Sequence, residues 1–311
     1  MRMVTERISS DTDGILRAAE LLRLGQLVAF PTETVYGLGA DATNGEAVAA
    51  IYEAKGRPSF NPLIVHVASA ADAERIGIVP DAAQVFLEYG WPEGLTLVMP
   101  LRGDAGLSPL VTAGEASVAV RVPSAPIARR LIEAFGGPIA APSANPSGRI
   151  SPTSADHVLL GLNGRIAGVL DGGATTTGLE STILGFDGDA PVVLREGVYQ
   201  VPGDLARKTT IDPSAVKTPG QMASHYAPLG RVRLNADAAR VGEWFIGFGD
   251  CDDCAVNLSP TGDLKEAAAR LFAVLHEADA LGQTKIAVTP IPDEGLGRAI
   301  NDRLRCAAAP R

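Results

Sequence analysis

Cysteine and long hydrophobic runs are both scarce in this chain. Its 311 residues include 3 cysteines, which are too few for a disulfide framework, and Cys251 with Cys254 supplies half of a four-ligand zinc site. No apolar run approaches the roughly 20 residues that a membrane-spanning helix needs, and no basic segment precedes an apolar core at the N-terminus. We expect a cytoplasmic protein that has no membrane partner and whose own residues bind no metal.

Positive charge is also in deficit. The chain has 27 Lys+Arg against 36 Asp+Glu, a formal net charge of −9, so nonspecific binding to a nucleic-acid backbone is disfavoured as the main activity. The phosphate-loop pattern GxxxxGK[ST] and the dinucleotide fingerprint GxGxxG are absent, as are GxSxG and HExxH. A small basic pocket within an acidic surface remains compatible with these absences.

The length and composition favour two α/β domains. The chain is 46% hydrophobic and 20% charged, with 34 Gly and 22 Pro, which is typical of a globular α/β protein with many ordered turns. Apolar periodicity lapses over residues 202–230, where Pro and Gly punctuate the sequence, so this stretch is interpreted as an interdomain linker. The predicted domains are therefore residues 1–201 and 231–311.

Within these domains, strand-like and helix-like patterns alternate loosely. Helices are predicted at 11–24, 45–55, 127–135 and 264–281. Strands are predicted at 27–30, 63–67, 95–100, 118–122, 136–141, 168–170, 181–186, 191–194, 244–249 and 285–289. Several of the strands are separated by short turns, which indicates a mixed sheet.

Two polar clusters are candidates for a site. Lys55 and Arg57 flank Gly56 at a predicted helix end, where they hold a polyphosphate from two directions or merely complement the helix dipole. The loop 141–151, APSANPSGRIS, follows an apolar strand; its hydroxyls and amides suit ribose or phosphate oxygens, although an ordinary turn-rich loop has the same composition. His66, inside an apolar strand, is more often a core residue than a catalyst.

These segments together resemble a known family. The motifs are FPTETVYGL at 30–38, KGRP and NPL at 55–63, SAN at 143–145, LESTI at 179–183, LREG at 194–197 and KTPGQMASHYAP at 217–228. In this order they are similar to the YrdC-type threonylcarbamoyl-AMP synthases in their long, two-domain form. The resemblance implies a YrdC-like twisted mixed sheet flanked by helices, followed by a smaller Rossmann-like α/β domain.

The resemblance also implies a reaction. Threonine and bicarbonate or CO2 form a carbamate, whose oxygen attacks the α-phosphorus of ATP and expels pyrophosphate, with Mg²⁺ accompanying the nucleotide. The product, L-threonylcarbamoyladenylate, serves the tRNA threonylcarbamoyl transferase machinery, and a weak contact with tRNA is compatible with this role. Such chemistry needs orientation and charge compensation rather than a side-chain nucleophile.

Site residues follow from the matching positions. The implied catalytic pair is Lys55 and Arg57. The residues implied to hold threonine are Thr34, His66, Arg121 and Ser181. Those implied to contact ATP are Arg57, Asn61, Ser117, Ala141, Ser143, Asn145, Ser151, Arg195 and Tyr226. Because Tyr226 lies in the linker, its role implies that the linker closes over the cavity.

Two other functions are alternatives for this sequence. One is a carbamoyl-adenylate-forming module, as in hydrogenase-maturation proteins, but those proteins carry additional zinc-finger segments and this chain has no run of paired cysteines. The other is a noncatalytic RNA-binding module, against which the overall acidity argues.

Overall fold

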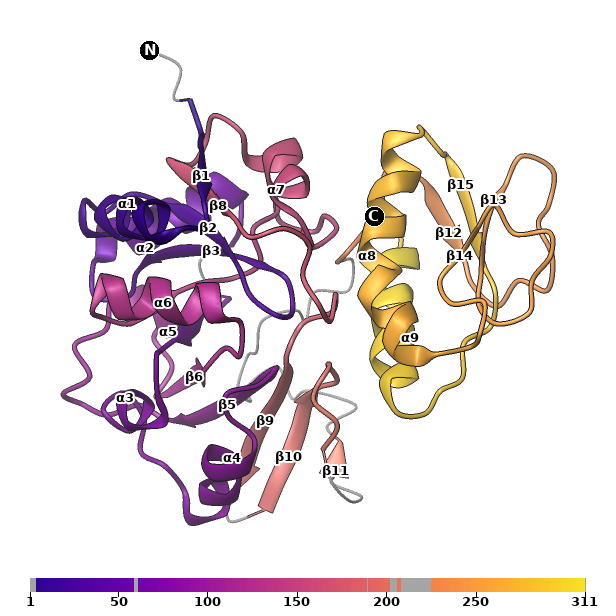
Figure 1. Ribbon diagram of the computed structural model, residues 1–311. Coiled ribbons are helices and arrows are strands. Elements are labelled where there is room, and N and C mark those ends of the chain that lie inside the picture. The colour runs from indigo at the N-terminus through magenta and orange to yellow at the C-terminus, as the bar shows by residue number, and fades with distance from the viewer. Residues whose placement is uncertain (1–3, 59–60, 189, 202–205, 208–224, 311) are drawn as a thin grey trace.

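Strand pairing divides the chain into two sheets (Figure 1). In this computed structural model the residues described are 4–58, 61–188, 190–201, 206–207 and 225–310, and within them the strands form an eleven-stranded mixed sheet and a four-stranded parallel sheet. The large sheet contains β1 (Glu6–Ser9), β2 (Val28–Pro31), β3 (Tyr36–Asp41), β4 (Ile64–His66), β5 (Leu95–Pro100), β6 (Ser117–Arg121), β7 (Ile139–Ala140), β8 (Gly168–Asp171), β9 (Thr182–Asp187), β10 (Ala190–Arg195) and β11 (Ala206–Arg207).

The order of these strands mixes local and distant pairings. It runs β1-β8-β2-β3-β7-β4-β6-β5-β9-β10-β11. Strands β4 and β6 are parallel, whereas β2 and β3 form an antiparallel hairpin. The predicted mixed sheet is confirmed. However, β11, which lies inside the stretch interpreted as a linker, pairs with β10 and so belongs to the large sheet. Residues 202–205 and 208–224 of that linker lie outside the described residues, whereas 225–230 are described.

Helices cover both faces of the large sheet. The helices of this region are α1 (Thr12–Arg23), α2 (Gly45–Lys55), α3 (Ala70–Glu74), α4 (Gln84–Tyr89), α5 (Pro109–Thr112), α6 (Pro126–Phe135) and α7 (Ala155–Leu162), with a 3-10 turn, η1, at Asp81–Ala83. Val28 and Phe30 share an apolar cluster with α1 and α6, whereas Leu27 and Ala29 belong to the cluster of α2 and α7. This alternation is the period of a strand buried on both faces.

Helix ends place the first polar cluster. Asn44 caps α2 by accepting hydrogen bonds from two backbone N–H groups, and Gly56 ends the helix in the left-handed conformation at φ 60°. Glycine adopts this conformation without the steric cost that a Cβ imposes. Helix α2 therefore stops between Lys55 and Arg57, and its bounds confirm the prediction for 45–55.

The smaller unit is built on parallel strands. Its elements are β12 (Arg231–Arg233), β13 (Trp244–Gly247), β14 (Val256–Asn257), β15 (Lys285–Val288), α8 (Leu264–Ala280) and α9 (Leu296–Ala308). The strand order is β12-β15-β13-β14 and every pairing is parallel. Figure 1 shows α8 and α9 between this sheet and the large unit. The predicted fold class, an α/β mixed sheet followed by a smaller α/β unit, is confirmed.

The two units share one apolar cluster. Val35, Ile150 and Leu179 of the large unit pack with α8 and α9 residues such as Phe272. A Cβ on Gly178 would lie 2.5 Å from the Ala269 carbonyl oxygen, so glycine allows α8 to approach this closely. No helix in the described part of the chain has the length and apolarity to cross a bilayer.

Candidate active site

The candidate site is a cavity beside β4 and β6. Val65 and Val120 belong to the cluster on the α2 side of the sheet, so the alternation of strand side chains directs His66 and Arg121 to the opposite face. These two residues are direct partners in the parallel register of β4 and β6. The cavity is lined by Thr32, Thr34, Val35, Gly37, Arg57, Ile64, His66, Arg121, Ala141, Pro142, Ser143, Glu180, Ser181, Arg195, His225 and Tyr226.

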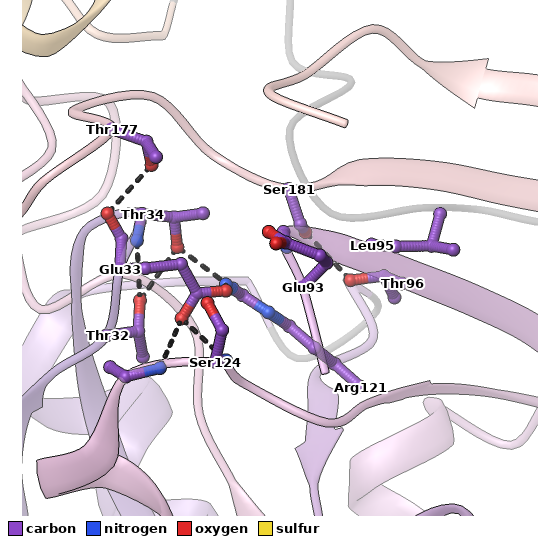
Figure 2. A network of polar contacts seen from close by, with 12 residues as sticks. Thr32, Glu33, Thr34, Glu93, Leu95, Thr96, Arg121, Ser124, Thr177 and Ser181 are labelled. Carbon is purple, nitrogen blue, oxygen red and sulfur yellow. Dashed lines mark hydrogen bonds and ion pairs between the residues drawn. The ribbon is translucent and has the colours of Figure 1, made fainter. Parts of the chain in front are cut away.

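A buried ion pair orients Arg121. Its guanidinium donates to Thr34 Oγ1 at 2.9 Å and pairs with Glu33 Oε1. The other Glu33 oxygen accepts the backbone N–H groups of Ser124 at 3.1 Å and Ala125 at 3.2 Å, at the start of α6 (Figure 2). Burial alone would raise the pKa of Glu33, but Arg121 and these hydrogen bonds outweigh it, so the pKa is lowered and the carboxylate stays ionised.

His66 is held as a neutral imidazole. Burial, together with the charge of Arg121, lowers its pKa to about 3. Its ring meets Phe30 edge-on at a centroid distance of 5.9 Å, and Nδ1 lies 3.2 Å from the Ile64 carbonyl oxygen. At neutral pH this side chain offers hydrogen bonding without adding charge beside Arg121.

Arg57 lines the cavity, whereas Lys55 lies behind the lining residues. Arg57 Nη2 donates to the Pro62 carbonyl at 3.2 Å, while its buried Nε has no hydrogen-bond partner among the described residues. Burial lowers the pKa of Arg57 to about 10, so it remains a cation at neutral pH. Lys55 lies behind the lining, where Nζ donates to the carbonyl oxygens of Ser143 and Asn145. Lys55 therefore fixes the loop whose residue Ser143 faces the cavity.

Ser181 is fixed from two sides. Arg195 donates to the Ser181 carbonyl at 2.8 Å and to its Oγ at 3.1 Å. Ser181 Oγ also lies 2.7 Å from Thr96 Oγ1 (Figure 2). A hydroxyl held by two partners presents a fixed hydrogen-bonding direction.

Tyr226 closes the cavity from the side of the smaller unit. It is 1% exposed, has a positive φ of 60°, and stacks on Phe272 of α8 at a centroid distance of 5.4 Å. Its neighbour His225 also lines the cavity, and the buried His225 Nδ1 has no partner among the described residues. The site thus draws on both units.

Glu180 connects the cavity to α9. Its Oε1 accepts from Ser151 Oγ at 2.6 Å, and its Oε2 accepts from Arg303 Nε at 2.8 Å. Arg303 is 0% exposed and lies over the Tyr226 ring at 5.3 Å. A second arginine–glutamate pair therefore flanks the cavity.

The sequence is similar to known proteins over nearly its whole length. A family model described as "Telomere recombination" (Sua5_yciO_yrdC) matches residues 20–197, and one described as "Threonylcarbamoyl-AMP synthase, C-terminal domain" matches residues 192–309. Threonylcarbamoyl-AMP synthase of Bacillus subtilis strain 168 is 41% identical over 335 aligned residues, covering 99% of this chain and 96% of the relative. The chain belongs to the threonylcarbamoyl-AMP synthase family. A relative of the same name from Pyrococcus abyssi is 39% identical, covering 94% of each protein.

Solved structures agree with this family assignment. The crystal structure of Pyrococcus abyssi Sua5 complexed with L-threonine aligns with a TM-score of 0.88 at 36% identity, covering 98% of both chains. Escherichia coli YciO, at 22% identity, covers 64% of this chain and 98% of its own with a TM-score of 0.57. The second likeness shows that the large unit shares a fold with YciO.

Most residues predicted from the synthase resemblance lie at the cavity. Those that line it are Thr34, Arg57, His66, Arg121, Ala141, Ser143, Ser181, Arg195 and Tyr226. Lys55, Asn61, Asn145 and Ser151 contact lining residues or their neighbours from behind. Ser117 is not brought to the lining, since it begins β6 and Arg121 ends it, about 13 Å away at about 3.3 Å per residue. The roles of all these residues stay predictions.

Four contributors to the geometry were not predicted. Glu33 and Glu180 lay inside the recognised motifs, and an acidic residue beside small polar ones was an available signal. Phe272 and Arg303 come from α8 and α9, and nothing in the local sequence connects them with the cavity. Helix α9 itself was missed because Arg303 interrupts its apolar stripe of Ala299, Ile300, Leu304 and Ala307.

Proposed function

We propose that this protein joins L-threonine, bicarbonate or CO2 and ATP into L-threonylcarbamoyladenylate with release of pyrophosphate. The observation that carries the proposal is the cavity itself, where three arginines from distant parts of the chain line one buried space within the described residues. Both Arg57 and Arg121 keep a buried Nε without a hydrogen-bond partner among those residues. Buried donors of this kind await an anionic ligand.

The threonine half of the proposed site is built on the sheet. Arg121 is the partner for the amino-acid carboxylate, and the hydroxyls of Thr34 and Ser181 are fixed nearby by the contacts described above. His66, neutral at physiological pH, completes this side of the cavity. The complex of the Pyrococcus abyssi relative with L-threonine supports this substrate.

The nucleotide half lies toward Arg57 and Arg195. Their positive charges offset the phosphates, with Ser143 and Tyr226 in the lining and Asn61, Asn145 and Ser151 as further contacts. Ser117, which lies outside this lining, stays a predicted nucleotide contact. Mg²⁺ enters with ATP, which supplies phosphate oxygens as its ligands. In the described part of the chain, no three or more His, Cys, Asp or Glu side chains form a cluster suited to a metal ion.

The reaction needs no protein nucleophile. Threonine and bicarbonate condense to a carbamate with loss of water, and its oxygen forms a bond to the α-phosphorus while the bond to pyrophosphate breaks. The chain's residues orient the two partners and compensate the charge that moves from the attacking to the leaving oxygen. Exclusion of water by His225 and Tyr226 protects the labile carbamate. The lining encloses ≈ 50 Å³, far below the roughly 300–1,000 Å³ of ligand pockets, so the cavity widens when substrates enter.

The proposed product is an activated adenylate, so a transferase must consume it. We assign that role to the enzymes that modify an adenosine of tRNA, with any contact between this chain and tRNA weak, and we place the reaction in the cytoplasm. The proposal also keeps the division into residues 1–201 and 231–311, joined by 202–230.

Mass spectrometry of complete and incomplete reactions tests the proposal. Purified protein is incubated with ATP, Mg²⁺, L-threonine and bicarbonate, and each component is omitted in turn. We expect threonylcarbamoyladenylate and pyrophosphate only in the complete mixture, and a loss of product in Arg121→Ala but not in Arg17→Ala, an exposed arginine of α1. Product formed without threonine, or none from folded protein, would favour the carbamoyl-adenylate or RNA-binding function.

A further inference from the structure

Glu180 is an unfavourable residue for an anion site. Among the described residues that line the cavity, Glu180 is the one with a carboxylate, and it is 6% exposed. ATP brings several negative charges into the same space, where solvent screening is weak. An uncompensated carboxylate there would repel the nucleotide and would itself be costly to bury.

Most of the compensating charge comes from the smaller unit, because Arg303 acts on Glu180 more strongly than Arg195 of the large unit does. Arg303 of α9 reaches Glu180 with Nε at 2.8 Å, and both side chains are buried. The remaining nitrogens of Arg303 are also engaged, with Nη1 on Asp302 and Nη2 on the Glu196 carbonyl oxygen at 2.9 Å. These contacts fix the guanidinium in one geometry. Figure 1 shows α9 on the side of its unit that faces the large sheet.

Arg303 also acts on Ser151, through Glu180, and directly on Tyr226. The Glu180 oxygen that Arg303 leaves free accepts from Ser151 Oγ at 2.6 Å. The guanidinium lies 5.3 Å from the centroid of the Tyr226 ring, which is buried against Phe272. Burial is the largest cause that raises the pKa of Tyr226, so the phenol stays protonated and keeps its hydroxyl as a donor.

We propose that Arg303 is a positioning residue for ATP: it neutralises Glu180 and holds Ser151 and Tyr226 in place, so that the smaller unit completes the nucleotide half of the site. The inference rests on the proposed function. It identifies Arg303 as the residue of the smaller unit that supports the proposed ATP-binding half of the cavity. It assigns no part to Arg303 in binding threonine, because Arg121 is held by Glu33 and Thr34 inside the large unit.

A role in domain packing alone gives a different expectation. Arg298, five residues before Arg303 on α9, pairs with Glu196 at 3.3 Å and also joins the two units. It does not contact Glu180. Arg298→Met therefore removes an interdomain ion pair and leaves the charge of Glu180 compensated, which makes it the matched control.

Calorimetric titrations separate these possibilities. ATP with Mg²⁺, and separately L-threonine, are titrated into the full-length wild type, Arg303→Met, Arg303→Lys, Arg298→Met and the double variant Arg303→Met with Glu180→Gln. We expect Arg303→Met to weaken ATP binding about tenfold or more, with threonine affinity within about twofold. Arg303→Lys restores part of the loss because it keeps the charge, and Arg298→Met changes neither affinity by more than about twofold.

The double variant decides the matter. If uncompensated charge causes the loss, Glu180→Gln restores most of the ATP affinity that Arg303→Met removes, and it also protects the fold, since a neutral pair leaves no buried charge. Equal losses for both ligands, or no recovery in the double variant, would overturn the inference. Unchanged ATP affinity in Arg303→Met would overturn it while leaving the proposed function intact. A wild type that binds neither ligand would overturn both.

Discussion

The two buried arginine–glutamate pairs at the cavity have opposite orientations. In the first pair Arg121 lines the cavity and Glu33 stands behind it, held by the start of α6. In the second pair Glu180 lines the cavity and Arg303 stands behind it, on the other unit. The first arrangement presents positive charge to a ligand, whereas the second cancels a negative charge that the ligand would meet. We infer that the threonine half is self-contained and that the nucleotide half depends on docking.

The largest expected effect comes from breaking the self-contained pair. Arg121→Ala removes the proposed carboxylate partner and leaves Glu33 buried without its cation. We expect a loss of threonine affinity of about a hundredfold, together with about 3–5 kcal/mol of unfolding free energy. Calorimetry and urea unfolding measure the two effects.

A second substitution separates the two consequences of that change. Arg121→Ala combined with Glu33→Gln recovers stability, because no buried charge is left unpaired, yet threonine affinity stays low. Recovery of both quantities would contradict the assignment of Arg121 to threonine.

A substitution at Gly178 should disrupt the packing of the smaller unit against the large unit. This residue has φ +71°, and an added Cβ would meet the backbone of α8 at Ala269. Gly178→Ala should cost about 2–4 kcal/mol through backbone strain and steric overlap, and it should weaken ATP binding more than threonine binding. Gly173→Ala is the matched control, since its φ is +79° but its Cβ would meet no atom within 4 Å. The control should cost about 1–2 kcal/mol and spare both affinities.

Acid should weaken docking at a stacked histidine pair. His157 of α7 and His276 of α8 lie 3.9 Å apart with an interplanar angle of 18°, and His276 Nε2 is 3.2 Å from the Ser151 carbonyl. Burial, followed by His157 and Arg149, lowers the pKa of His276 to about 3. Burial also lowers the pKa of His157, against the nearby charge of Asp156.

The direction of this pH effect follows from the lowered pKa values. Each imidazole takes up a proton below about pH 6.5 when exposed, whereas His276 stays neutral in the docked protein down to about pH 3. Stability is therefore present above pH 6.5 and is lost as the pH falls toward 3, by at most about 1.4 kcal/mol per pH unit for each histidine. Urea unfolding between pH 7.5 and 5.5 should show a slope that His276→Phe reduces. An unchanged slope would contradict this account.

The smallest effect is expected at an exposed pair. Arg75 and Asp72 lie 3.2 Å apart on the surface, with 80% and 36% of their side chains exposed. Water screens such a pair and long side chains lose entropy in forming it, so Arg75→Ala should leave Tm and both affinities unchanged. A clear loss would show that burial is not what distinguishes the two pairs at the cavity.

Local sequence patterns were sufficient for the elements that carry their own signals. The bounds of α2 and β5 agree with the prediction, because Asn44 and Gly56 mark the helix and an uninterrupted apolar run marks the strand. Strand β6 begins one residue earlier than predicted, at Ser117, a polar residue that the apolar run does not include. Sheet neighbours carry no such signal, so the pairing of His66 with Arg121 was visible only in the structure.

The interdomain part of the site was beyond local patterns. Tyr226 was predicted from the family motif, but its stacking partner Phe272 lies in another helix. Arg303 lies on the buried face of α9, where an amphipathic helix normally has an apolar residue. Neither the helix nor the role of Arg303 was therefore predicted from the sequence. Charge compensation between units depends on how two folded surfaces meet, which sequence periodicity does not encode.

A reciprocal titration tests the central claim most directly. The affinities of Arg121→Ala and Arg303→Met for L-threonine and for ATP with Mg²⁺ are measured under one set of conditions. The account predicts that the first variant loses threonine and keeps ATP, and that the second loses ATP and keeps threonine. Parallel loss of both ligands in both variants would contradict the division of the cavity into a self-contained half and a docked half.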